Sequence, residues 1–113
     1  TIKKNIITSD FSNCLINGFK LSHSCLKNVS FNKCSGELTE PNNKIITMGI
    51  NNMSLQNCRL ENVSFNDVFF HDNNTVLLSN LQNVIFSKSI CNITFNQSIF
   101  SKTKFINSNA KQI

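Results

Sequence analysis

The sequence predicts an all-β fold, a solenoid in which the chain turns a corner about every five residues. The stretch NNMSLQNCRLENVSFNDVFFHD carries Leu55, Leu60, Phe65 and Phe70 at five-residue intervals, and Ile50 extends the series backwards. A period of five is neither the 3.6 of a helix nor the 2 of a flat strand. An apolar side chain that points the same way at every fifth residue, with a bend between, indicates a chain that winds in coils around a shared core.

The apolar position of each pentad is always Ile, Leu or Phe, and it recurs in three blocks. Eight of the ten phenylalanines occupy it. The third block slips by one residue at Ile90. The predicted core positions are Ile6, Phe11, Ile16, Leu21, Leu26 and Phe31, then Ile45, Ile50, Leu55, Leu60, Phe65 and Phe70, and finally Leu81, Phe86, Ile90, Phe95, Phe100 and Phe105.

Two further patterns flank each apolar position. Two residues before it the chain usually places a small or β-branched residue, as at Cys14, Val29 and Cys58, and such a residue shares the inward strand face. Two residues after it the chain usually places Asn, Asp or Gly, as at Asn57 and Gly18. These residue types tolerate left-handed backbone, so each pentad is interpreted as a short extended piece followed by a corner.

One domain spans residues 1–113, with loop insertions predicted near 32–44 and 71–80. The first insertion, NKCSGELTEPNNK, holds the only proline and is predicted to bulge from the wall as a loop. Loops on rigid scaffolds often carry function, so Glu37, Glu40 and Pro41 form a candidate interaction loop, the alternative being a tolerated insertion. Within the second, Val76–Leu78 is expected to pack back against the wall.

Composition limits the function classes. The chain has 11 basic and 6 acidic residues, a net charge of +5 and a pI near 9.1. No apolar run approaches the ~18 residues that span a bilayer, so no membrane span is predicted. Five cysteines in 113 residues are too few for a disulfide scaffold, which favours a reducing cytoplasm. Six Asn-X-Ser/Thr sequons are interpreted as by-products of the repeat and of the 20 asparagines.

Segments such as Cys58–Asn62 (CRLEN) and Val63–Asp67 (VSFND) resemble the pentapeptide-repeat family: a small residue, a polar residue, Leu or Phe, then two polar residues. The resemblance covers residues 4–107 apart from the two interruptions. It implies a right-handed quadrilateral β-helix of four to five coils, with four pentads and about twenty residues in each coil.

The same geometry implies that Cys14 and Cys34, one coil apart, stack on neighbouring rungs roughly 5 Å apart. A disulfide between them is then conceivable. The interpretation favoured here is a pair of reduced cysteines in a column of small residues, because Cys58 occupies the same kind of position.

The sequence offers little for catalysis, and no enzymatic activity, cofactor or metal is predicted. His23 and Cys25 form an H-x-C pair, but both lie off the inward positions, and no second ligand cluster completes the four ligands that zinc needs. Asp67 and Asp72 stand one pentad apart at corners, where turn formation explains them better than acid–base chemistry.

Three binding functions remain. The favoured one is a structural or protein-interaction module with broad polar walls. Mimicry of duplex DNA, known in this family, is disfavoured. Duplex DNA carries one negative charge per ~1.7 Å, so a mimic of four to five coils ~4.8 Å apart needs on the order of a dozen acidic residues. This chain has 6. Nucleic-acid binding draws on Lys88, Lys102, Lys104 and Lys111, with no acid after Asp72, but it lacks exposed aromatic platforms apart from Phe69, so it is the weaker alternative.

The ends of such a solenoid expose strand edges. Neither end has an amphipathic cap, so either two copies meet end to end or an adjacent domain covers an end. The first residue is Thr1 rather than methionine, which favours a piece of a longer protein. The Phe- and Asn-rich composition is similar to β-helix domains of secreted bacterial effectors, including HECT-like ubiquitin ligases, which implies release into a host cell.

Overall fold

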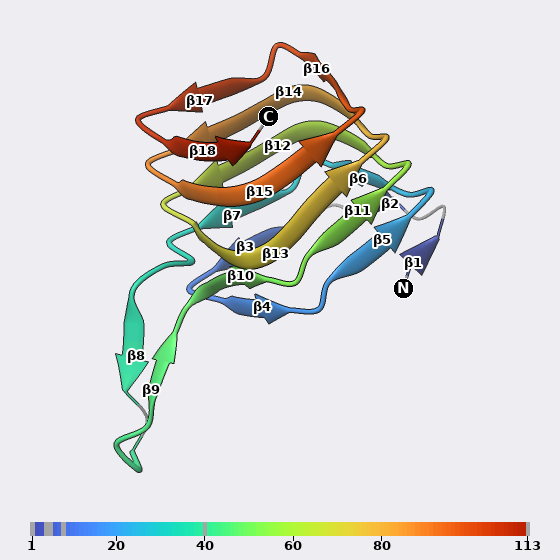
Figure 1. Cartoon of the computed structure of the whole chain (residues 1–113). Coiled ribbons are helices and arrows are strands. Elements are labelled where there is room, and N and C mark those ends of the chain that lie inside the picture. The colour runs from blue at the N-terminus through green and yellow to red at the C-terminus, as the bar shows by residue number, and fades with distance from the viewer. Residues whose placement is uncertain (1, 4–5, 8, 40, 113) are drawn as a thin grey trace.

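The computed structural model describes residues 2–3, 6–7, 9–39 and 41–112, which form an all-β architecture of parallel strands curled around one core. The molecule measures 42 × 30 × 23 Å along its principal axes. Its termini lie at opposite ends of a stack of coils (Figure 1). Within the described ranges no helix is long and apolar enough to span a membrane.

The strands form two large parallel sheets and one small antiparallel sheet. The first sheet contains β1 (Ile2–Lys3), β4 (Leu15–Asn17), β5 (Lys20–Ser22), β10 (Gly49–Asn51), β11 (Ser54–Gln56), β13 (Phe69–Leu77), β15 (Ile90–Asn96) and β18 (Asn109–Gln112). The second contains β2 (Ile6–Ile7), β3 (Asp10–Ser12), β6 (Cys25–Lys27), β7 (Ser30–Asn32), β12 (Arg59–Asn66), β14 (Asn80–Ser87), β16 (Ile99–Ser101) and β17 (Lys104–Ile106). The small sheet pairs β8 (Glu37–Thr39) with β9 (Ile45–Thr47).

The strand register repeats once per coil. Phe11 pairs with Phe31, 20 residues further on, and Leu55 pairs with Val76, 21 residues further on. Because the pairing is parallel and in register, like side chains lie above one another in columns.

The column along β3, β7, β12, β14 and β17 is built entirely of phenylalanine. Its rings stack nearly parallel, with centroid distances of 5.0, 4.9, 4.8 and 4.6 Å between successive rings. The three middle rings are buried, whereas the first and last are partly buried. The members of this column are Phe11, Phe31, Phe65, Phe86 and Phe105.

Most of the other predicted core positions lie in the neighbouring columns. Leu21, Leu26, Ile50, Leu55, Leu60 and Phe70 are fully buried, Phe95 is 8% exposed, and Ile16 and Phe100 are partly buried against the same cluster. All of these side chains belong to one core.

Corners separate the strands, and the residue found most often at them is asparagine with positive φ, as at Asn28, Asn57, Asn62 and Asn83. The side-chain amide of Asn62 donates to Asn28 Oδ1 (3.1 Å), and that of Asn83 donates in turn to Asn62 Oδ1. Asparagine therefore serves the corner twice, since it tolerates the left-handed backbone and links successive coils.

The second predicted insertion differs from expectation. Residues 71–77 belong to β13, and the irregularity is a single extra residue between Phe70 and the corner at Asn73, which lengthens the step from Phe70 to Val76 to six residues. The Asn74 side chain is buried: its Oδ1 accepts from Met53 N (2.9 Å), and its amide donates to the carbonyl of His71 (2.9 Å). A buried amide with these partners fills the bend, so no loop is needed.

Two predicted core positions are wrong. Ile90 is 48% exposed, and Cys91 points inward in its place, paired in register with Phe70. The rings of Phe70, Phe86 and Phe95 converge in this part of the core, which favours a small side chain there. Ile45 lies in β9, outside the coils, and is 59% exposed.

At the start of the chain, Ile7 rather than Ile6 is in register with Leu26. This leaves a four-residue step from Ile7 to Phe11 where five was predicted.

Candidate interaction site

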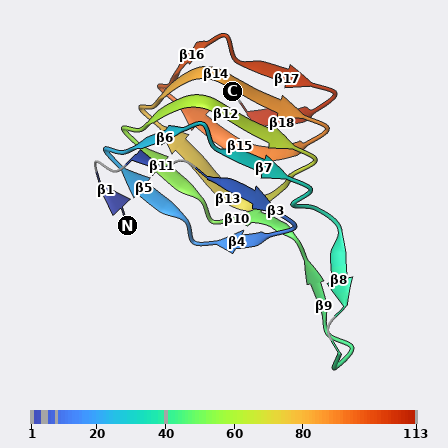
Figure 2. The same cartoon turned by 180° about the vertical axis from the view of Figure 1, so that it is seen from behind.

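The β8–β9 hairpin projects from the body at one corner and lies away from the stacked coils (Figures 1 and 2). It is an insertion between two residues of one coil. Cys34 is the last coil residue before it, since Cys34 O accepts from Phe69 N (2.9 Å) in the next coil. Gly49 is the first residue after it, since Gly49 N donates to Cys14 O (3.0 Å) in the coil below.

Hydrogen bonds fix the root of the hairpin to the coils. Met48 N donates to Gly36 O (2.9 Å) and closes the root itself. The Ser35 hydroxyl donates to Asp67 Oδ1 (2.9 Å) at the corner after β12. On the other side, His71 Nε2 lies 3.1 Å from Met48 O and its ring stacks on Phe69. The hairpin is therefore anchored on both sides although its tip extends into solvent.

Gly49 lies in β10 where the chain returns from the hairpin and packs against β13. Its φ of 147° disfavours residues with a side chain, and a Cβ there would meet Phe69 O and lie 2.7 Å from His71 Nε2. Only glycine allows the return of the hairpin and the Phe69–His71 ring pair to share this space.

The candidate interaction loop predicted from the sequence corresponds to this hairpin. Glu37 begins β8 and is exposed, and Pro41 lies exposed at the turn. Glu40 lies outside the described residues. The loop has regular antiparallel pairing of Leu38 with Ile46 that its composition did not reveal.

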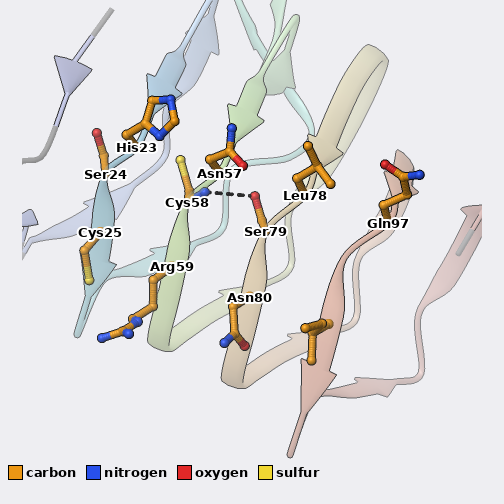
Figure 3. A pocket seen from close by; sticks show the side chains of 11 residues that line it. His23, Ser24, Cys25, Asn57, Cys58, Arg59, Leu78, Ser79, Asn80 and Gln97 are labelled. Atoms are coloured by element: carbon orange, nitrogen blue, oxygen red, sulfur yellow. Dashed lines mark hydrogen bonds between the residues drawn. The ribbon is translucent and has the colours of Figure 1, made fainter.

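His23 and Cys25 lie beside an open depression at a different corner (Figure 3). Burial, and secondarily the nearby Glu61 carboxylate, raises the pKa of the Cys25 thiol. A raised pKa favours the thiol over the nucleophilic thiolate, so this pair lacks the activation that a catalytic cysteine needs. Of the two aspartates predicted at corners, Asp67 is held there by Ser35, whereas Asp72 lies exposed within β13, one residue before the corner at Asn73.

The cysteines are all free thiols. Cys14 and Cys34 face each other across neighbouring coils, as the register predicts, and Cys58 Sγ donates to Leu21 O (3.5 Å). Burial raises the pKa of Cys34, and it raises the pKa of Cys91 to about 12. Within the described ranges no three His, Cys, Asp or Glu side chains gather in a way that could hold a metal ion.

A search against protein-family models gives no match, and no curated protein matches the chain significantly. The resemblance to the pentapeptide-repeat family therefore stays a prediction based on the residues that carry it.

Proposed function

We propose that this chain is a non-catalytic protein-interaction module that holds the β8–β9 hairpin out from a rigid coiled scaffold. The observation that carries the proposal is the way the hairpin is inserted. The coils continue in register across it, and the root is fixed by Ser35, Met48 and His71. A rigid support with a projecting strand pair is a common arrangement for recognition.

The hairpin offers strand edges to a partner. Within the described residues β8 and β9 pair only with each other, so each has an outer edge with unpaired backbone groups. An extended segment of a partner protein adds to such an edge through main-chain hydrogen bonds, and the exposed Ile45 supplies an apolar contact beside them.

The proposal includes the finer geometry implied by the family resemblance, a right-handed quadrilateral β-helix. One coil, counted from Phe70 up to its in-register partner Cys91, contains four buried pentad centres: Phe70, Val76, Leu81 and Phe86. Four inward positions per coil with a corner after each support a four-sided cross-section. An experimental structure that gives another cross-section or the opposite hand would refute this part.

The module is further proposed to belong to a larger protein such as a secreted bacterial effector, in which another domain supplies any catalysis. The reducing cytoplasm of a host cell is compatible with its free cysteines.

The test removes residues 35–48. From Phe31 to Ile50 the chain takes 19 steps, and removal of these 14 residues leaves 5, the step of an uninterrupted coil. The shortened chain is therefore expected to fold with an unchanged β-type circular-dichroism spectrum. A photo-crosslinking amino acid at position 45 is expected to capture a partner protein in the cells where the chain acts, and excess unlabelled full chain should compete.

The shortened chain, used as the competitor, is expected to leave the capture unchanged, because it lacks the hairpin. The matched control carries the crosslinker at Ile106, which is 45% exposed on the body. Equal capture from positions 45 and 106, or competition by the shortened chain, would show that the hairpin is not the recognition element.

A nucleic-acid role is a second candidate because one observation favours it. The described residues after Asp72 contain no acid, and Lys88, Lys102 and Lys104 are exposed. Backbone contacts by these lysines would give retention on a DNA or RNA column that falls steeply with salt. No retention at low salt would exclude this function.

A further inference from the structure

Leu78 is an anomaly among the corners. Of the non-glycine residues with positive φ in the described part of the chain, it is the only apolar one, with φ of 51°. The left-handed conformation costs a residue such as leucine about 1–2 kcal/mol, a cost that asparagine largely avoids through its short polar side chain. The corresponding corners of the neighbouring coils carry Asn57 and Gln97.

Burial offsets this cost only in part. The Leu78 side chain is 46% exposed. A strained backbone that gains little from packing is more typical of a functional position than of a structural one.

Leu78 lies beside the open depression of about 690 Å³ that His23 and Cys25 also line (Figure 3). The depression also includes Ile99, which at 66% is the most exposed of the large apolar side chains in the described residues. The amide side chains of Asn57, Asn80 and Gln97 also line it, so two exposed aliphatic side chains share the depression with hydrogen-bonding groups. Such a mixture of apolar and hydrogen-bonding groups is typical of surfaces that contact another protein.

The positive charge of the depression favours a partner segment that carries a negative charge. Arg59 is the only residue with a permanent charge among those that line it, and no Asp or Glu does. The Arg59 guanidinium pairs with Glu61 at 3.4 Å, but its side chain is 63% exposed, so this surface pair is weak and exchangeable. A carboxylate of a partner would form a bidentate pair with the guanidinium in its place.

We propose that the depression around Leu78 and Ile99 is a second docking site, which binds an extended protein segment carrying an aliphatic residue next to an acidic one. The aliphatic side chain contacts Leu78 and Ile99, the carboxylate pairs with Arg59, and the amides of Asn57 and Asn80 hydrogen-bond to the segment's backbone. The turns between β5 and β6, β11 and β12, and β13 and β14 carry most of its lining residues, and in Figure 1 these turns lie at a different corner from the β8–β9 hairpin. The site therefore works without the hairpin.

The test is a selection of random peptides displayed on phage against the immobilised full chain, followed by affinity measurements on the enriched peptides. Enriched sequences are expected to combine Leu, Ile or Val with a neighbouring Asp or Glu. Leu78→Asn introduces the residue most common at these corners, so it should keep or raise the midpoint temperature of unfolding while it weakens peptide binding at least about tenfold. Arg59→Gln should weaken binding of the acidic peptides, and the remaining affinity should no longer depend on salt concentration.

The matched control is Ile106→Asn, which removes an aliphatic side chain of similar exposure outside the depression and should leave peptide binding unchanged. The chain without residues 35–48 should bind the peptides as the full chain does, which separates this site from the hairpin. The proposal is overturned if no peptide is enriched over the Leu78→Asn chain, or if the enriched peptides are basic. A clear drop in unfolding temperature with Leu78→Asn would also overturn it, because Leu78 would then be a packing residue. The proposal would also be overturned if the full chain bound a DNA duplex or an anionic vesicle and Leu78→Asn abolished that binding.

Discussion

Equivalent side chains in this molecule make the same contact in each coil, and the phenylalanine column shows how much stability one such side chain contributes. Phe65 is 3% exposed and its ring lies between those of Phe31 at 4.9 Å and Phe86 at 4.8 Å. We expect Phe65→Ala to lower the free energy of unfolding by about 3–5 kcal/mol, since the neighbouring rings belong to fixed strands and cannot fill the cavity. Urea unfolding followed by circular dichroism measures it.

The control for this substitution is Asn57→Ala at an exposed corner. It should cost only about 1 kcal/mol, the penalty of placing alanine in left-handed backbone at φ of 53°. Equal losses for Phe65→Ala and Asn57→Ala would contradict the assignment of the inward face.

The buried cysteines make the free energy of unfolding depend on pH in alkaline solution. Burial raises the pKa of Cys91 from 9.0 to about 12. Above pH 9 the unfolded chain therefore releases this proton while the folded chain keeps it, so the free energy of unfolding is expected to fall between pH 9 and about 12. The slope contributed by one such group is at most about 1.4 kcal/mol per pH unit.

Cys91→Ala is expected to make this decline shallower in urea unfolding measured from pH 8 to 10.5. Some decline should remain, because burial raises the pKa of Cys34 as well. An identical slope in the two chains would mean that the Cys91 thiol is accessible to solvent in the folded state.

At the level of elements, the join between the hairpin and the coils depends on one glycine. Gly49→Ala is expected to destabilise the fold by about 3 kcal/mol or more, because its methyl group would overlap Phe69 O and the His71 ring. Thermal unfolding of the variant measures this loss.

Gly18→Ala is the control, since Gly18 also has positive φ (81°) but nothing lies within 4 Å of its Cβ position. It should cost only the conformational term of about 1–2 kcal/mol. If the two alanine variants lose equal stability, close packing of β10 on β13 is not what selects Gly49.

The elements also show where the period of five predicts structure and where it fails. It located every column of the core in residues 50–70, because an uninterrupted period leaves one choice of inward face. It failed where one residue was added or lost. Between Phe86 and Phe95 either Ile90 or Cys91 satisfies an apolar pattern, and only packing against Phe70 decides for Cys91.

Asn74 and Ile45 are failures of a different kind. Nothing in the sequence distinguishes a buried asparagine from the corner asparagines around it, since its burial depends on the acceptor and donor groups of other coils. Ile45 falls in phase with Ile50 by coincidence, whereas antiparallel pairing with Thr39 places it in the hairpin. The candidate hairpin itself was marked by Pro41 and by the break in the period. The prediction that Val76–Leu78 packs against the wall is right for Val76, which is buried, and wrong for Leu78, which is 46% exposed and has no marker in the sequence.

For the whole molecule, the stacking of coils implies a gradient of stability along the stack. Each coil contacts only its neighbours, so inner coils are held on two sides and outer coils on one. β12 pairs with β6 and β7 on one side and β14 on the other, whereas β3 pairs in the described residues with β7 alone. The corner amides that link the coils should therefore differ in their protection from hydrogen exchange.

Asp67 N donates to Ser87 O (2.9 Å) between inner coils, and Asn13 N donates to Asn32 O (3.2 Å) from an outer coil. We expect the backbone amide hydrogen of Asp67 to exchange at least about tenfold more slowly than that of Asn13. NMR in deuterated water measures both exchange rates. Phe11→Ala should accelerate exchange at Asn13 and leave Asp67 almost unchanged, because local opening of the first coil does not require the inner coils to separate. Equal protection of the two amides, with equal acceleration by Phe11→Ala, would instead mean that the stack opens only as one cooperative unit.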